Sequence, residues 1–447
     1  MSGNFSGSSA KTPILRQEGS SRHGKGCGML TALVGAVMIL GAQAPLPTAF
    51  VLTGARVIDG TGRPPIEQGA ILVRNGRVEA VGTQAAVAVP AGVTRIDVSG
   101  KTIVPGFINA HAHVDLDDQS TVPARDQLNA QLKLYSDYGV TTVYSLGDDG
   151  VESVKLRDDQ RRGTPDRARL NVAGTNVVAP TAEEARRGID AAAARKVDVI
   201  KTRVDGPDNS PQRMAPSVYG ALIDQAHKQN LRVAVHMFFL KDAKGLVDAG
   251  VDMLAHSVRD QDIDAALINE MKRRNVGYIP TLTRELSVFV YESTPAFFGD
   301  PFFTRQDSYR ALMGRLTDPA NQARVRSNAN AQATKKALVQ ANRNLKMLQD
   351  AGVLIAMGTD SGAGLGRWQG FFEHTELEMM VTAGLTPMQA IVAATGNAAK
   401  VTKLDGELGT LQPGKWADFI VLNANPLADI KNTKQMDSVW IAGRKLN

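Results

Sequence analysis

The chain has 447 residues, of which 43% are hydrophobic and 21% are charged, so it can bury a large core and a smaller second one. The formal net charge is +6, but half of it lies in the first 49 residues, where four basic residues against one acidic residue give +3. No run of lysines and arginines with interleaved aromatic residues occurs. The composition therefore gives no support to nucleic-acid binding.

The N-terminus has the order of a secretory signal peptide. A basic, Ser- and Gly-rich stretch up to Lys25 precedes the charge-free run 29–40, and small residues follow up to Ala44. We therefore predict a signal peptide over residues 1–44, a secreted or periplasmic protein, and no stable membrane association after cleavage near Ala44. An uncleaved membrane anchor and a true start at Met29 are the alternatives, although the run is short for a membrane span. The only cysteine, Cys27, precedes the cleavage point, so the mature chain would have no disulfide.

Short strands and turns are expected at both ends of the remaining chain. Residues 51–59 alternate between apolar and polar, and residues 70–81 form a hairpin pattern around Asn75-Gly76. The same texture returns at residues 417–422 and 438–444. We predict one composite β-sandwich domain built from residues 50–104 and 405–447.

The middle of the chain alternates short apolar runs with helical patterns. Helices are expected, for example, over residues 218–229 and 262–274. The expected strands span residues 103–110, 141–146, 169–173, 198–201, 232–236, 252–256, 277–281 and 353–358. Eight strands that alternate with helices predict an α/β fold, a (β/α)₈ TIM barrel over residues 105–404.

One connection of this barrel is long. Residues 284–349 separate the seventh and eighth strands and contain seven aromatic residues before an expected helix from Asn321. An insert of that size over a barrel mouth is more often a substrate lid or an oligomer contact than filler. We also expect the protein to be a homo-oligomer.

Potential metal ligands gather at the ends of the expected strands. His111 and His113 are two residues apart, so on a strand both imidazoles point the same way. The chain has only seven histidines, and two more end strands of their own, as do one lysine and one aspartate. The six candidate ligands are His111, His113, Lys201, His236, His256 and Asp360. Chemistry in such barrels takes place at the carboxyl ends of the strands, so this pattern predicts a metal centre there.

Three longer segments identify a family. Residues 100–113 (GKTIVPGFINAHAH), 383–390 (AGLTPMQA) and 408–422 (LGTLQPGKWADFIVL) are typical of the amidohydrolase superfamily. The chain resembles its branch of imidazolonepropionase-related proteins and prolidase-like dipeptidases, and the resemblance covers residues 51–447. It implies a TIM barrel with a small β domain and a metal-dependent hydrolase that cleaves carbon–nitrogen bonds.

The resemblance also implies roles for the six ligands. His111, His113 and Asp360 would hold one metal ion, His236 and His256 the other, and a carboxylated Lys201 would bridge them. Imidazolonepropionase resembles a one-metal variant without this lysine, so Lys201 favours a binuclear enzyme. The ligands contain no thiolate and suit two Zn²⁺ ions without excluding other divalent metals.

Four side chains on or near strand ends are candidates for substrate binding. Arg259 lies three residues after His256, and its guanidinium could bind a substrate carboxylate through two hydrogen bonds. Weaker candidates are Tyr144, Arg203 and Arg284, each of which could instead form a structural contact at the barrel rim. We expect His227 and His374 to be structural, and His23 lies in the expected signal peptide.

These residues support one mechanism and several substrates. A water that bridges two metal ions would lose a proton near neutral pH and attack as hydroxide, with Asp360 as the proton carrier. The expected small-molecule substrate is an amide beside a carboxylate, namely a dipeptide, an N-acyl amino acid or an ochratoxin-like amide. A cyclic amide or lactone is a second possibility. A catalytically inactive metal-binding protein is a third, which the complete set of ligands disfavours.

Overall fold

Strands from both ends of the described chain form one eight-stranded sheet. A computed structural model describes residues 49–206 and 214–446, which lie in one unit, Leu46–Asn447; the expected signal peptide lies outside them. The sheet has the order β15-β14-β13-β5-β1-β2-β3, with β4 beside β1. Its strands are β1 (Ala49–Val57), β2 (Ile66–Arg74), β3 (Arg77–Thr83), β4 (Thr94–Asp97), β5 (Thr102–Pro105), β13 (Phe419–Leu422), β14 (Met436–Ile441) and β15 (Arg444–Lys445).

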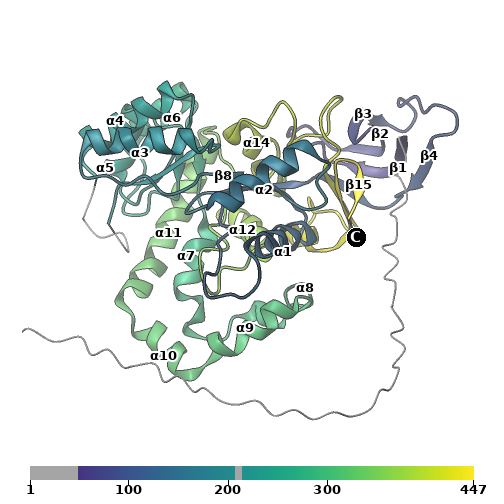
Figure 1. The fold of residues 1–447 in the computed structure, drawn as a ribbon. Coiled ribbons are helices and arrows are strands. Elements are labelled where there is room, and N and C mark those ends of the chain that lie inside the picture. Colours follow the sequence, from purple (N-terminus) through teal and green to yellow (C-terminus); the bar gives the residue numbers. More distant parts are fainter. Residues whose placement is uncertain (1–48, 207–213, 447) are drawn as a thin grey trace, which may run out of the picture. The chain divides into compact units, whose positions relative to one another are not determined.

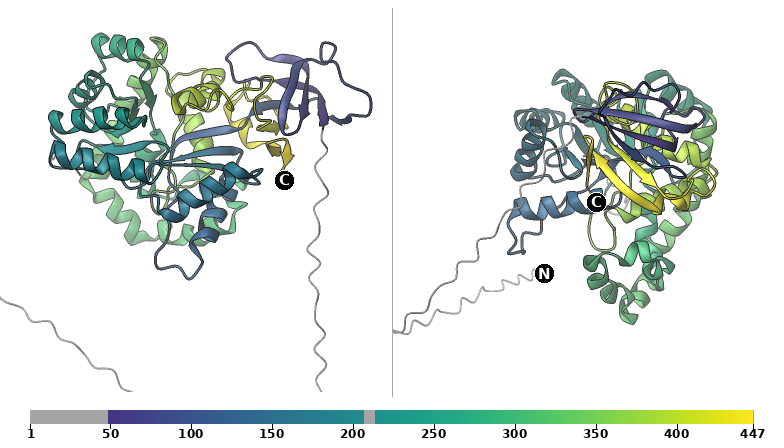
Figure 2. Two further views of the ribbon diagram at one scale, coloured as in Figure 1. Left: turned by 45° about the horizontal axis from the view of Figure 1, so that its top comes forward. Right: turned by 90° about the vertical axis from the view of Figure 1, so that its right-hand side faces the viewer.

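The two chain ends meet where β13 pairs antiparallel with β5. Figure 1 and Figure 2 show the purple N-terminal strands beside the yellow C-terminal ones. The structure thus joins strands from both ends in one sheet. The two-layered sandwich and the domain boundaries at residues 50–104 and 405–447 stay predictions.

The strand expected over residues 103–110 is two strands in different sheets. β5 ends at Pro105, whose nitrogen cannot donate a hydrogen bond, and β6 begins at Phe107. Gly106 lies between them, and a Cβ there would collide with the Thr141 side chain. The chain therefore changes sheets at a residue where no side chain fits, which a continuous apolar run in the sequence conceals.

The parallel strands of the middle region lie in two sheets, ordered β6-β7-β8 and β12-β11-β10-β9. Their bounds are β6 (Phe107–Ala112), β7 (Val140–Ser145), β8 (Arg169–Val172), β9 (Ile200–Arg203), β10 (Val233–His236), β11 (Met253–Ala255) and β12 (Gly277–Ile279). The expected eighth strand, 353–358, is not a regular strand and forms only an isolated parallel bridge, Ile355 with Tyr278. Further along, Ser361 bridges Ala112 of β6. The fold is α/β, and a single closed barrel stays a prediction.

Helices follow the parallel strands, as the alternating pattern predicted. Those expected over residues 218–229 and 262–274 are present as α4 and α6. The helices before and after the long insert, together with α7 which runs into its start, are α1 (Ala124–Asp137), α2 (Val151–Arg162), α3 (Ala182–Ala194), α4 (Pro216–Lys228), α5 (Leu240–Asp248), α6 (Ala265–Arg274), α7 (Leu282–Phe289), α12 (Phe371–Thr382), α13 (Pro387–Ala393), α14 (Gly396–Thr402) and the short 3₁₀ helix Ile430–Lys434. Among the described residues, no helix has both the length and the apolar composition needed to cross a membrane.

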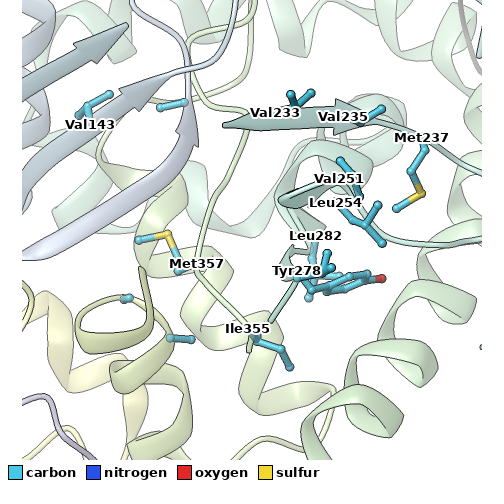
Figure 3. Packing of buried hydrophobic residues seen from close by; sticks show 14 of the residues in the cluster. Val143, Val233, Val235, Met237, Val251, Leu254, Tyr278, Leu282, Ile355 and Met357 are labelled. Atoms are coloured by element: carbon cyan, nitrogen blue, oxygen red, sulfur yellow. The ribbon is translucent and has the colours of Figure 1, made fainter. Parts of the chain in front are cut away.

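Apolar side chains from the strands and helices pack into a shared core. Val233 and Val235 of β10, Leu254 of β11 and Tyr278 of β12 are fully buried in this cluster (Figure 3). Every residue of these three strands is buried. Strands covered on both faces have continuous apolar sequences, which explains why short apolar runs located them correctly.

The long insert packs its aromatic side chains against α12. Phe303 is fully buried, and its ring centroid lies 5.0 Å from that of Phe371 and 4.9 Å from that of Trp368. The helix expected from Asn321 is present in two pieces, α10 and α11, because Asn328 caps the second piece. The insert contains the 3₁₀ helices Val290–Glu292 and Ala296–Gly299, and the helices α8 (Pro301–Thr304), α9 (Asp307–Thr317), α10 (Pro319–Ser327) and α11 (Ala329–Asp350).

Phe303→Ala tests this packing. We expect the free energy of unfolding to fall by about 3–5 kcal/mol, because a buried phenyl group is lost and a cavity remains. Val339 on α11 is 62% exposed, so the control Val339→Ala should change it by no more than about 0.5 kcal/mol. Urea denaturation measures both. Equal stabilities would mean that the insert does not pack on α12.

Candidate functional site

One cavity of about 300 Å³ collects all six candidate metal ligands at the carboxyl ends of the parallel strands. The remaining lining residues include three arginines and an asparagine. The six ligands lie in or directly after β6, β9, β10 and β11 and in the segment after residue 358, and they are His111, His113, Lys201, His236, His256 and Asp360. Side chains 249 residues apart in sequence therefore face one space, as the strand-end pattern predicted.

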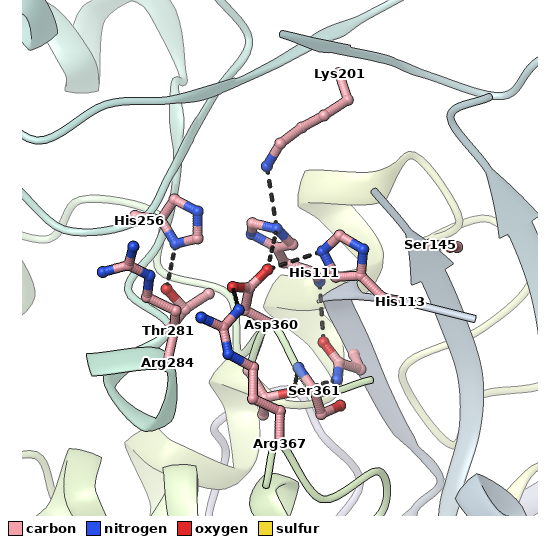
Figure 4. A network of polar contacts seen from close by, with 12 residues as sticks. His111, His113, Ser145, Lys201, His256, Thr281, Arg284, Asp360, Ser361 and Arg367 are labelled. Atoms are coloured by element: carbon pink, nitrogen blue, oxygen red, sulfur yellow. Dashed lines mark hydrogen bonds and ion pairs between the residues drawn. The ribbon is translucent and has the colours of Figure 1, made fainter. Parts of the chain in front are cut away.

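The ligand atoms lie within contact distance of one another (Figure 4). Asp360 Oδ1 is 2.8 Å from His113 Nε2 and 3.1 Å from His111 Nε2. Lys201 Nζ is 3.0 Å from His111 Nε2. The His256 ring centroid lies 4.6 Å from that of His111 and 4.3 Å from that of His236. Among the described residues, His111, His256 and Asp360 have donor atoms that all lie within 4.8 Å of one another.

Burial keeps three of the imidazoles neutral. Desolvation, assisted by Lys201, lowers the pKa of His111 to about 3, and desolvation also holds the pKa values of His236 and His256 well below the ordinary value. A neutral imidazole keeps a lone pair on one nitrogen, which is the form that binds a metal ion. His236 Nε2 is buried and makes no hydrogen bond, so it fits a metal ligand.

Burial acts on Lys201 in the same direction. Desolvation lowers the pKa of its amine to about 7, so a large fraction of the amine is unprotonated near neutral pH. Only the unprotonated amine has a lone pair that can react with CO₂ or donate to a metal ion. The environment of Lys201 therefore fits a carbamate.

Asp360 stays ionised in spite of its burial. Desolvation would raise its pKa, but Arg367 and the hydrogen bonds from His111 and His113 hold the pKa well below the ordinary value. Burial disfavours the protonated form of His113, as it does for the other imidazoles, yet the adjacent carboxylates of Asp115 and Asp360 raise its pKa to about 9. A metal ion at His113 therefore has to displace that proton.

Hydrogen bonds from neighbouring side chains hold two of the ligand residues. Asn109 Oδ1 accepts a hydrogen bond from the His111 backbone nitrogen at 3.0 Å. Thr281 Oγ1 lies 2.6 Å from His256 Nδ1, so the other ring nitrogen of His256 is left to face the cavity. The sequence analysis missed Thr281, although it ends an expected strand.

Two further cavity residues also escaped the sequence analysis. Arg367 lines the cavity and forms an ion pair with Asp360, and Asn176 lines it from the loop after β8. Arg367 directly follows the glycine-rich turn 362–366. Its position beside Asp360 depends on that turn, where Gly362 has φ +87° and lies against the His113 carbonyl.

The structure brings two of the four expected substrate-binding residues to the cavity. Arg203 and Arg284 line it. Arg203 Nε lies 3.0 Å from Asp205 Oδ1, and Arg284 Nη1 lies 2.9 Å from Glu285 Oε2. Each guanidinium thus has a carboxylate on one side and the cavity on the other.

Arg259 and Tyr144 do not line this cavity. The Arg259 side chain is fully buried, with Nη1 3.3 Å from Glu285 Oε1 and its guanidinium 4.8 Å from the Phe238 ring centroid. The Tyr144 hydroxyl donates a hydrogen bond to the Thr402 carbonyl at 2.8 Å. Both residues were predicted from their positions on or near strand ends. Their side chains point instead toward partners that are distant in sequence. Their roles toward substrate stay predictions.

The two histidines expected to be structural lie outside the cavity. His227 Nε2 is 2.9 Å from Asp252 Oδ2, and His374 lies between Thr433 Oγ1 and the Tyr138 carbonyl, each at 2.9 Å. Both imidazoles have structural partners.

Known proteins share this arrangement of strands. Ochratoxinase from Aspergillus niger is 28% identical over 289 residues, which cover 61% of this chain and 51% of that relative, so the match spans about half of its length. A candidate prolidase from Bifidobacterium longum has a crystal structure with a TM-score of 0.73 at 26% identity, covering 90% of this chain and 95% of that one. A Xaa-Pro dipeptidase with bound methionine has a TM-score of 0.70 at 20% identity, covering 89% and 99%, which shows the shared fold. Residues 102–446, most of the chain, match the Amidohydrolase family, and the chain therefore belongs to this family of hydrolases.

Proposed function

We propose that the protein is a metal-dependent hydrolase that cleaves an amide bond next to a carboxylate, in a dipeptide, an N-acyl amino acid or an ochratoxin-like amide. The observation that carries the proposal is the convergence of four imidazoles, Asp360 and Lys201 in one buried cavity whose wall also contains Arg203 and Arg284. The relatives named ochratoxinase and Xaa-Pro dipeptidase support this substrate class.

The donor atoms suit two divalent ions, of which Zn²⁺ is the best match to imidazole and carboxylate ligands. His111, His113 and Asp360 would hold one ion, and His236 and His256 the other. Lys201, as a carbamate, would lie between them. Such ions polarise a scissile carbonyl and lower the pKa of water.

Asp360 would move the proton during the reaction. Its low pKa keeps the carboxylate ionised, so it can accept a proton from the attacking water and pass it to the leaving nitrogen. Arg367 pairs with Oδ2, while Oδ1 faces His111 and His113. The two oxygens of this carboxylate are therefore held in fixed directions.

Arg284 would bind the substrate carboxylate. Arg284 follows β12 at the start of α7 and lines the cavity. Arg259 also forms an ion pair with Glu285 but does not line the cavity. A guanidinium held from behind by a carboxylate keeps its remaining N–H groups aimed at an anion in front.

Three other expectations also stand as proposals. The two parallel sheets would close into a barrel, which the hydrogen bonds Ala110 N to Met357 O and Tyr278 N to Leu354 O support on either side of the eighth segment. The order of basic, apolar and small residues over 1–44 supports export. The long insert supports a homo-oligomer or a lid.

Lys201→Ala tests the metal centre. Both metal content and turnover of N-acyl amino acids and dipeptides should fall to a small fraction of the wild-type values, because the bridging ligand is lost. Short carboxylic acids should restore part of the turnover by filling the place of the carbamate. Metal analysis and a hydrolysis assay measure these effects, with the exposed Lys228→Ala as the control. Full metal content and turnover in Lys201→Ala would contradict the bridge.

Arg284→Gln tests the specificity. Removing one partner of a partly desolvated charge pair costs at least about 2 kcal/mol, so kcat/KM on amides with a free carboxylate should fall about thirty-fold or more. The same substrates with an amidated carboxylate should lose much less. Arg203→Gln and Arg259→Ala, measured in parallel, show which guanidinium makes the contact. An equal loss on both substrate forms would assign Arg284 to the fold or the metal site.

A further inference from the structure

Helix α12 carries a buried carboxylate that the proposed mechanism does not use. Glu376 is fully buried, whereas Glu378 on the same helix is part-exposed and pairs with Lys434. Burying a carboxylate is costly unless its oxygens receive hydrogen bonds. The hydrogen-bond partners of Glu376 therefore indicate its role in the structure.

Those contacts are all with the start of α7. Oε1 accepts a hydrogen bond from the Leu282 backbone nitrogen at 2.8 Å, and Oε2 accepts one from the Thr283 backbone nitrogen at 2.7 Å. The Thr283 hydroxyl also donates to Oε2, at 2.8 Å. The first N–H groups of a helix have no partners within the helix, and an anion there is favoured by the helix dipole. Glu376 thus fixes the N-terminus of α7 from a neighbouring helix.

The residue just before that N-terminus contacts a metal-ligand candidate. Thr281 has φ +49° and ψ +51°, a left-handed conformation that a β-branched residue rarely adopts. In this conformation Thr281 Oγ1 lies 2.6 Å from His256 Nδ1 (Figure 4). The bond occupies Nδ1 and leaves Nε2 of the His256 ring for the cavity. The fixed start of α7 offsets the cost of holding Thr281 in this conformation.

A second contact leads from the same clamp to Asp360. The Thr283 hydroxyl lies 3.1 Å from the carbonyl oxygen of Thr359, the residue directly before Asp360. Thr283 has a single hydroxyl hydrogen, which it can donate either to Glu376 Oε2 or to the Thr359 carbonyl. The Glu376 carboxylate therefore holds the start of α7, which places Thr281 beside His256 and Thr283 beside the backbone of Asp360.

We propose that Glu376 is a positioning residue for the metal centre, which acts through Thr281 on His256 and through Thr283 on the backbone of Asp360. The inference rests on the metal site of the proposed function and is independent of the substrate. Partners that orient a ligating histidine typically change metal affinity 10–100-fold when they are removed.

Glu376→Gln is the first test. The side chain keeps its size, but its amide NH₂ group cannot accept a hydrogen bond from one of the two backbone nitrogens. We expect the Zn²⁺ dissociation constant, measured by competition with a chromophoric chelator, to rise about 10–100-fold. Glu378→Gln on the same helix is the matched control and should keep the wild-type constant. Circular dichroism establishes that each variant is folded.

Thr281→Val is the second test, and it decides the matter if Glu376→Gln fails to fold. It replaces the hydroxyl with a methyl group and keeps a β-branched side chain, so the left-handed backbone conformation is strained in the wild type and in the variant alike. We expect Zn²⁺ affinity to fall at least about ten-fold. Wild-type affinity in Thr281→Val, or in a folded Glu376→Gln, would overturn the positioning role while leaving the metal site standing. A wild-type protein that binds no Zn²⁺ would overturn the proposed function itself, and this inference with it.

Discussion

The site depends on one physical constraint, the burial of ionisable groups at the carboxyl ends of parallel strands. Their side chains are buried among protein atoms, so desolvation keeps His111, His236 and His256 neutral and brings the pKa of Lys201 down to about 7. The same groups in water would be partly or wholly protonated and would repel a cation. The core below the strand ends therefore prepares the ligands chemically before any metal ion binds.

The sequence predicted the six clustered side chains because they follow a simple geometric rule. Parallel strands end at a common edge, and a strand buried on both faces is visible as a short apolar run. His236 and Lys201 lie within regular strands, and His256 follows one directly. Asp360 follows a segment that forms only an isolated bridge, and it still reaches the cavity. The prediction needs only the position of each side chain at the end of an apolar run, so it holds even where that run does not form a regular strand.

Features set by contacts distant in sequence could not be predicted in this way. The change of sheet at Gly106 depends on the close approach of the Thr141 side chain, which leaves no room for a Cβ, and no local sequence pattern predicts it. Arg259 was preferred over Arg284 by its spacing from a ligand, yet the structure turns Arg259 toward Phe238 and leaves Arg284 on the cavity wall. Side-chain direction after a strand end depends on the following loop, whose course the sequence does not reveal.

Helix α12 connects the two parts of the molecule that the sequence analysis treated separately. Its Phe371 packs on Phe303 of the long insert, with ring centroids 5.0 Å apart. Two residues later, Glu373 accepts hydrogen bonds from Ser361 and Thr359, which flank Asp360. Helix α12 therefore packs against the insert through Phe371 and holds the residues that flank Asp360 through Glu373, so one helix links the insert to a segment that carries a candidate ligand.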